Sequence, residues 1–185
     1  MSRTLRQTDS RIKPIAAWDT SMTAKIITFE FGAREVEVMV RPLTTLQAVL
    51  RDQLGFTATK EGCRQGGCGS CTVLVDGEPM LSCLLPAEDV AGKRITTLET
   101  ITPAAGLHPI QQAFLDAHAL QCGYCTPGMV MASKALLDHD PAPGDDEIRQ
   151  ALAGNICRCT GYRPIVEAVH EAARVMREQT AEQER

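Results

Sequence analysis

The first half of the chain alternates apolar and polar residues with a period of two. Residues 25–40 contain KIITFEF and REVEVMV, two alternating runs separated by a glycine, and predict a β-hairpin. Residues 72–85, TVLVDGEPMLSCLL, carry the turn signal Asp76-Gly77 and predict a second hairpin. Residues 93–99, KRITTLE, predict one further strand.

A short helix is expected between the two hairpins. Thr44 or Thr45 is placed to cap the segment TTLQAVLRDQL, and Gly55 is placed to end it. A helix set among strands within about 75 residues predicts an α+β domain that resembles the β-grasp.

The period becomes helical after Thr102-Pro103. Four amphipathic segments predict four short helices, which begin near Pro109, Pro127, Asp145 or Asp146, and Arg163. The last of them places one apolar stripe on a single face: Ile165, Val169, Ala172 and Met176. We therefore predict an α+β chain with a flexible arm over 1–24, a β-grasp domain over 25–102 and a four-helix domain over 103–185.

Composition narrows the classes of function. Nineteen basic and 23 acidic residues give a net charge of −4, so no basic surface for nucleic acid is expected. The sequence contains no run of roughly 18 apolar residues, which a membrane-spanning helix would need, and no secretion signal is visible. We therefore expect a cytoplasmic protein. The chain nevertheless holds eight cysteines. In a reducing compartment cysteines more often bind metal or react than form stable disulfides.

The first cysteine set lies in a glycine-rich loop and the hairpin after it. It has the spacing Cys63-x4-Cys68-x2-Cys71-x11-Cys83. The x4/x2 spacing is that of plant-type ferredoxins, whose [2Fe–2S] cluster takes four thiolates. Glycines suit a loop that brings backbone N–H groups close to sulfur. The alternative is a zinc ribbon, which prefers paired Cys-x2–4-Cys knuckles.

The second cysteine set lies in the helical half. Its spacing is Cys122-x2-Cys125-x31-Cys157-x-Cys159, in loops before two predicted helices. Helix N-termini present unpaired N–H groups and partial positive charge, which favour a negatively charged cluster. Taken alone this set fits zinc or iron–sulfur equally, and beside the first set it favours a second [2Fe–2S] cluster. A reactive dithiol at Cys122 and Cys125 is disfavoured, because a thioredoxin-like βαβ pattern is missing.

Five stretches together resemble a known family: EGCRQGGCGSCTVLVDG, CLLPAEDV, LHPIQQAF, QCGYCTPGM and GNICRCTGYRPI. They are similar to the iron–sulfur subunit of the molybdenum hydroxylases, the xanthine dehydrogenase and aldehyde oxidase family. The resemblance covers about residues 25–178. It implies a plant-ferredoxin-like β-grasp domain with one [2Fe–2S] cluster and a helical domain with the other.

The resemblance also implies a function and partners. Electrons would leave a molybdopterin centre on a large subunit, pass both clusters and reach FAD on a medium subunit, with no substrate chemistry on this chain. The heterotrimer would pair into a dimer of heterotrimers. The second set would hold the cluster nearer molybdenum and the first set the one nearer flavin. Gln121 and Cys159 would contact the pterin. The alternatives are a free-standing two-cluster ferredoxin and a zinc-stabilised interaction module.

The chain departs from the family pattern at Arg64, where glycine is common. A side chain there requires an ordinary φ or a tolerated left-handed one, and it adds a cation near the first cluster. We expect a slightly raised reduction potential, with a solvent-facing or interface arginine as the alternative, and Arg158 invites the same interpretation. The four histidines show no ligand-like grouping and are expected on helix surfaces or at interfaces.

Overall fold

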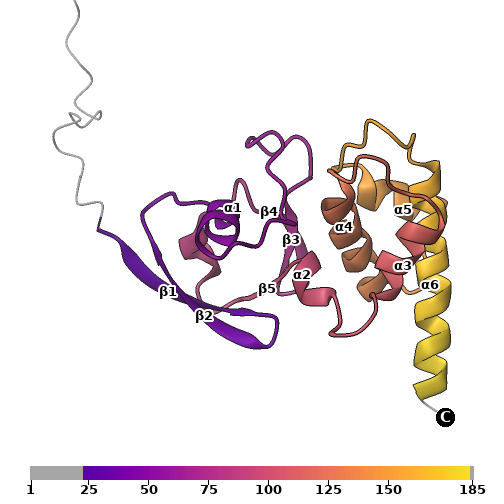
Figure 1. The fold of residues 1–185 in the computed structure, drawn as a ribbon, viewed down its shortest axis with the longest axis horizontal. Coiled ribbons are helices and arrows are strands. Elements are labelled where there is room, and N and C mark those ends of the chain that lie inside the picture. Colours follow the sequence, from indigo (N-terminus) through magenta and orange to yellow (C-terminus); the bar gives the residue numbers. More distant parts are fainter. Residues whose placement is uncertain (1–22, 184–185) are drawn as a thin grey trace, which may run out of the picture.

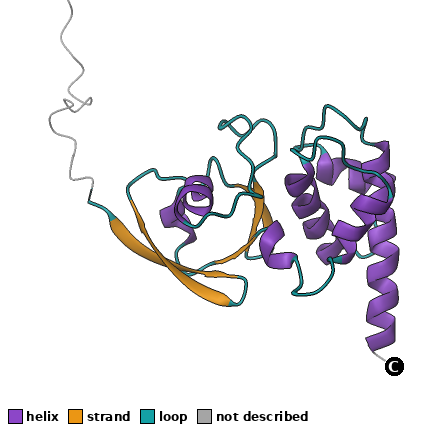
Figure 2. Ribbon diagram, viewed as in Figure 1, coloured by secondary structure: helices purple, strands orange, loops and turns teal. Residues whose placement is uncertain are grey.

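The computed structural model describes residues 23–183, so nearly all of the predicted arm lies outside the described residues. Two halves lie side by side (Figure 1). We name them by their elements: the sheet half, residues 23–97, and the helical half, residues 98–183. Figure 2 shows the strands confined to the first and the long helices to the second. The predicted α+β fold is confirmed.

The sheet half is built on a five-stranded mixed sheet in the order β2-β1-β5-β3-β4. β1 pairs with β5 in parallel, and the other neighbours are antiparallel, so both predicted hairpins are present. Asp76 and Gly77 both adopt positive φ at the second turn, as that turn requires. The strands are β1 (Lys25–Phe31), β2 (Arg34–Val40), β3 (Thr72–Val75), β4 (Glu78–Leu81) and β5 (Arg94–Thr96).

Short helices connect the strands. The helix expected after Thr45 is one turn of α-helix, α1 (Leu46–Ala48), that continues as a π-helix, η2 (Val49–Gln53). Thr45 caps it, since its side chain accepts a hydrogen bond from the Ala48 N–H at 3.2 Å. A 3₁₀ turn, η3 (Ala87–Val90), and a single helical turn, α2 (Leu98–Ile101), flank β5.

The helical half contains the four predicted helices. The apolar stripe of the last helix faces the core: three of its members are fully buried, and Met176 packs against the same core from a partly exposed position. The helices are α3 (Pro109–Asp116), α4 (Thr126–His139), α5 (Asp145–Leu152) and α6 (Arg163–Gln183).

Each half has its own apolar core, one around Phe29, Val49 and Ile95 and the other around Phe114, Met129 and Val169. The side chains of α2 already pack against the second core. The domain boundary that we predict between residues 102 and 103 stays a prediction. Across residues 23–183, no helix is long and apolar enough to cross a membrane.

His108 gives the helical half a pH-dependent cap. Its Nδ1 accepts a hydrogen bond from the Ile110 N–H at 3.3 Å at the start of α3, which requires an unprotonated Nδ1. Partial burial, followed by the charge of Lys134, lowers the pKa of His108. The stabilisation is therefore present above the unfolded pKa of about 6.5 and is lost as the pH falls through the lower folded value.

We expect the free energy of unfolding to fall between about pH 7 and pH 5, in part through His108. An asparagine side chain at this position would cap the helix at any pH, so His108→Asn should flatten this part of the profile. Urea unfolding of the full chain at a series of pH values measures it. An unchanged profile in the variant would contradict the assignment.

Candidate metal centres

The loop that carries most of the first set, residues 61–71, is anchored by polar side chains of the preceding helix. Gln47 is buried and donates from Nε2 to the Lys60 carbonyl at 2.9 Å. Arg51 donates to the carbonyls of Thr57 and Thr59 at 3.1 and 2.9 Å. These bonds satisfy backbone carbonyl groups just before the loop and fix where the loop starts. The position of Cys63 is therefore set by α1 and η2.

The first set is arranged as two pairs of thiols, each within hydrogen-bond range. Cys63 pairs with Cys68, and Cys71 pairs with Cys83. The backbone N–H of Gln65 and the Cys68 side chain lower the pKa of Cys63 to about 7. Burial raises the pKa of Cys71 to about 11. The pair of Cys63 and Cys68 is thus partly exposed, and the pair of Cys71 and Cys83 is buried inside the sheet half.

The second set shows the same arrangement. The Sγ atoms of Cys122 and Cys159 lie 3.6 Å apart and are exposed. Cys125, at the start of α4, pairs with Cys157. Burial raises the pKa of Cys125 to about 12. Burial of Cys157 is outweighed by hydrogen bonds from Thr160, so the pKa of Cys157 is lowered. Each set therefore holds an outer pair and an inner pair.

This pairing fits a two-iron cluster better than zinc. A [2Fe–2S] cluster takes two thiolates on each iron, whereas structural zinc draws four ligands to a single ion. Among residues 23–183, no three His, Cys, Asp or Glu side chains group closely enough to hold one metal ion, and the cysteines in that range are free thiols. Pairs of sulfurs, two in each set, are the donor arrangement that two irons require.

Glycine leaves the space that the sulfurs need in the first-set loop. A Cβ atom at Gly62 would lie 2.7 Å from the Cys68 Sγ. Gly66 and Gly69 adopt φ of +78° and +70°, a region that glycine enters without steric cost. The Gly67 N–H donates to the Cys63 Sγ at 3.2 Å, which shows backbone already directed at sulfur. The loop therefore fits the expected group.

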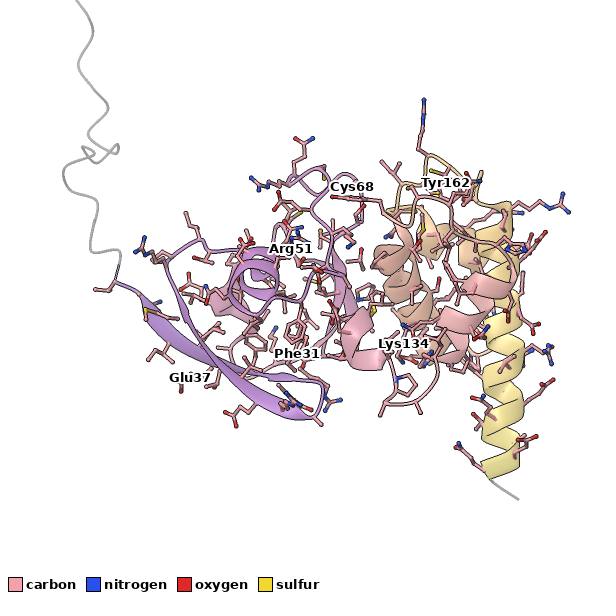
Figure 3. The ribbon with its side chains drawn as sticks, in the orientation of Figure 1. Phe31, Glu37, Arg51, Cys68, Lys134 and Tyr162 are labelled. Carbon is pink, nitrogen blue, oxygen red and sulfur yellow. The ribbon has the colours of Figure 1, made fainter. Side chains whose placement is uncertain are left out.

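The two cysteine sets meet where the halves pack together. The Ile156 N–H donates to the Cys68 carbonyl at 2.9 Å, and the buried Asn155 Nδ2 donates to the Gly69 carbonyl at 2.9 Å. A Cβ at Gly128 would lie 2.3 Å from the Gly69 oxygen, so the backbone of α4 lies directly against the backbone of this loop. We call the contact of Gly69 with Gly128 and Asn155 the seam. Figure 3 shows Cys68 in the sheet half and Tyr162 in the helical half.

Gln121, predicted to contact a pterin, is exposed next to the exposed Cys122, and Cys159 lies at the same pair. These three residues thus form an accessible edge of the second set. Arg64 adopts φ of +55°, the left-handed alternative, and its guanidinium is paired with the Glu61 carboxylate. Because that carboxylate offsets the charge, we expect a smaller effect on potential than from an unpaired arginine. Arg158 is exposed.

Two residues that position the second set were not singled out from the sequence. The Tyr162 hydroxyl accepts from the Cys157 N–H and donates to the Asn155 carbonyl, both at 2.9 Å, so it closes the turn that holds Cys157. Tyr162 reaches this position with φ of +69°. Asn155 joins that turn to the other half through the seam. Their closeness to Cys157 in the sequence is the one feature that could have indicated a positioning role. The hydrogen bonds themselves depend on the fold.

Comparison with known proteins agrees with this geometry. Residues 97–170 match the model of the [2Fe-2S] binding domain, and residues 10–121 match that of the 2Fe-2S iron-sulfur cluster binding domain. The chain is 46% identical over 135 residues to the nicotinate dehydrogenase small FeS subunit of Eubacterium barkeri, covering 73% of this chain and 86% of that one.

Two further relatives support the same conclusion. Aldehyde oxidase 1 of Oryctolagus cuniculus is 45% identical over 148 residues, which cover 74% of this chain and 11% of that one. Quinoline 2-oxidoreductase of Pseudomonas putida 86 superposes with a TM-score of 0.81 at 41% identity, over 84% of this chain and 97% of that chain. The chain therefore belongs to the family of iron–sulfur subunits of the molybdenum hydroxylases.

Proposed function

We propose that this chain passes single electrons from a molybdopterin centre on a large partner subunit to FAD on a medium partner subunit, or to another acceptor. The first set holds one [2Fe–2S] cluster and the second set the other. Each cluster, when bound, takes up and gives up one electron. The chain itself performs no substrate chemistry. The heterotrimer pairs into a dimer, in the cytoplasm, where thiols stay reduced.

The observation that carries this proposal is the bond from the Ile156 N–H to the Cys68 carbonyl. Cys68 belongs to the first set, and Ile156 directly precedes Cys157 of the second. The two sites are therefore joined by a few covalent bonds and one hydrogen bond of 2.9 Å. A relay needs its two sites adjacent and rigidly connected, and a protein with two unrelated metal sites does not.

Exposure supports the direction of the relay. Cys122 and Cys159 are exposed together with Gln121, so the second set presents an edge on which a large subunit can place its pterin. In the proposal, Gln121 and Cys159 contact that pterin. The first set lies beyond the seam, with Cys63 and Cys68 half-buried, and faces the flavin subunit.

Co-purification tests this proposal. The tagged full chain, expressed in its source cells, is expected to bring down two larger chains and to carry molybdenum and flavin in about equal amounts. The untagged strain is the control. Recovery of a brown chain alone would favour the free-standing ferredoxin and overturn the place of this chain in a larger enzyme. Recovery of a chain with zinc in place of iron would overturn the electron-transfer role as well.

A further inference from the structure

Tyr124 lies between two cysteines of the second set but makes its hydrogen bond in the other half. Its hydroxyl donates to the Glu61 carbonyl at 2.5 Å, and Glu61 precedes Cys63 of the first set by two residues. Gly123, which directly precedes Tyr124, adopts a φ of +79° in the same loop. The side chain therefore crosses from one cysteine loop to the other.

The residue that Tyr124 contacts is itself held in the first-set loop. The Glu61 carboxylate is paired with the guanidinium of Arg64, which directly follows Cys63. Arg64 adopts a left-handed φ of +55°, a conformation that costs free energy for a residue with a side chain. The ion pair alone is weak because both partners are partly exposed to solvent. The Tyr124 bond adds a second restraint at the same point.

The helical half thus holds this part of the loop at both ends. Tyr124 bonds to it before Cys63, and Ile156 and Asn155 bond to it at Cys68 and Gly69. The outer pair of the first set lies between these two attachments. The inner pair depends on its own half, where the Ser82 hydroxyl donates to the Cys71 carbonyl at 2.8 Å.

We propose that Tyr124 is a positioning residue, whose hydroxyl ties the Cys63–Cys68 pair to the second cysteine set and so fixes how the two sites face each other. This inference rests on the proposed function. One electron given up at the second site is taken up at the first. The rate of that transfer depends on a fixed separation, which the Tyr124 bond maintains at the Glu61 end of the loop.

The test uses the full chain loaded with iron and sulfide, and the variant Tyr124→Phe, which keeps the ring and removes the hydroxyl. A single hydrogen bond is worth about 1 kcal/mol, so we expect about fivefold faster amide hydrogen exchange in residues 61–67 of the variant. Exchange in β3 should not change. The magnetic interaction between the two reduced sites, measured by electron paramagnetic resonance, should weaken while each spin count stays the same.

Two further variants separate the hydroxyl from other effects. Thr180→Val removes an exposed hydroxyl bond within α6, to the Met176 carbonyl at 3.0 Å, and should leave loop exchange unchanged. Tyr124→Leu also removes the ring and should match Tyr124→Phe in the exchange of residues 61–67. Unchanged exchange and magnetic interaction in both Tyr124 variants, with two intact signals, would overturn this role alone. Loss of both signals in the unaltered chain would instead overturn the proposed function.

Discussion

Replacing Cys125 with serine is expected to remove one of the two clusters and leave the other in place. Cys125 belongs to the inner pair of the second set, at the start of α4, and serine cannot supply the thiolate that this iron requires. Iron and acid-labile sulfide should each fall from about four to about two per chain. Chemical analysis of the purified full chain measures this directly, and the remaining paramagnetic signal identifies the cluster that persists.

The matched variant is Cys71→Ser, which removes a member of the inner pair of the first set. It should lose the same amount of iron, but the paramagnetic signal that it loses should be the one that persists in the Cys125→Ser chain. This result is expected because each cluster takes all four of its ligands from one cysteine set. If either variant lost all of its iron, or if both lost the same signal, the division into two independent sites would be wrong.

Gly128→Ala is expected to lower the free energy of unfolding, although alanine is the better helix former. The substitution gains at most about 1 kcal/mol in α4 from propensity. However, the new Cβ would lie 2.3 Å from the Gly69 carbonyl oxygen and 3.0 Å from Asn155 Nδ2, and both belong to the seam. A backbone oxygen cannot move aside cheaply, and overpacking of this kind costs about 1–3 kcal/mol. We expect a net loss of about 1 kcal/mol.

Gly154→Ala is the matched control, because a Cβ at Gly154 would have no heavy atom within 4 Å apart from those of its own residue and its chain neighbours. Gly154 lies one residue from Asn155, so it probes the same region without the clash. It should be neutral or stabilising by about 0.4–1 kcal/mol. Urea unfolding of both variants measures the difference. A Gly128→Ala chain as stable as the Gly154→Ala chain would show that the halves do not meet in the way described.

Local chemistry explains why the strands and helices could be predicted. The Asp76-Gly77 turn works through two residues that tolerate positive φ, and this two-residue turn fixes the register in which β3 pairs with β4. In α6, Ile165, Val169 and Ala172 recur at helical spacing and are all buried. These signals lie within a few residues of one another, so a linear pattern contains them.

Contacts between distant segments could not be predicted in this way. Spacing grouped the cysteines in fours but did not show that Cys122 pairs with Cys159, 37 residues later. The same holds for Asn155 and Gly69, which lie 86 residues apart, and for Tyr124 and Glu61, 63 apart. The histidines are expected on helix surfaces or at interfaces, and that expectation does not include the hydrogen bond by which His108 caps α3. The partner subunits followed from family resemblance and not from any pattern in the residues.

We propose that the eight cysteines of this chain hold two one-electron sites. Reductive titration of the iron-loaded full chain, followed by electron paramagnetic resonance, tests it most directly. We expect two distinct signals from reduced [2Fe–2S] clusters, each integrating to about one spin per chain, together with about four irons. A single signal, or a colourless chain with about one zinc in each cysteine set, would contradict it.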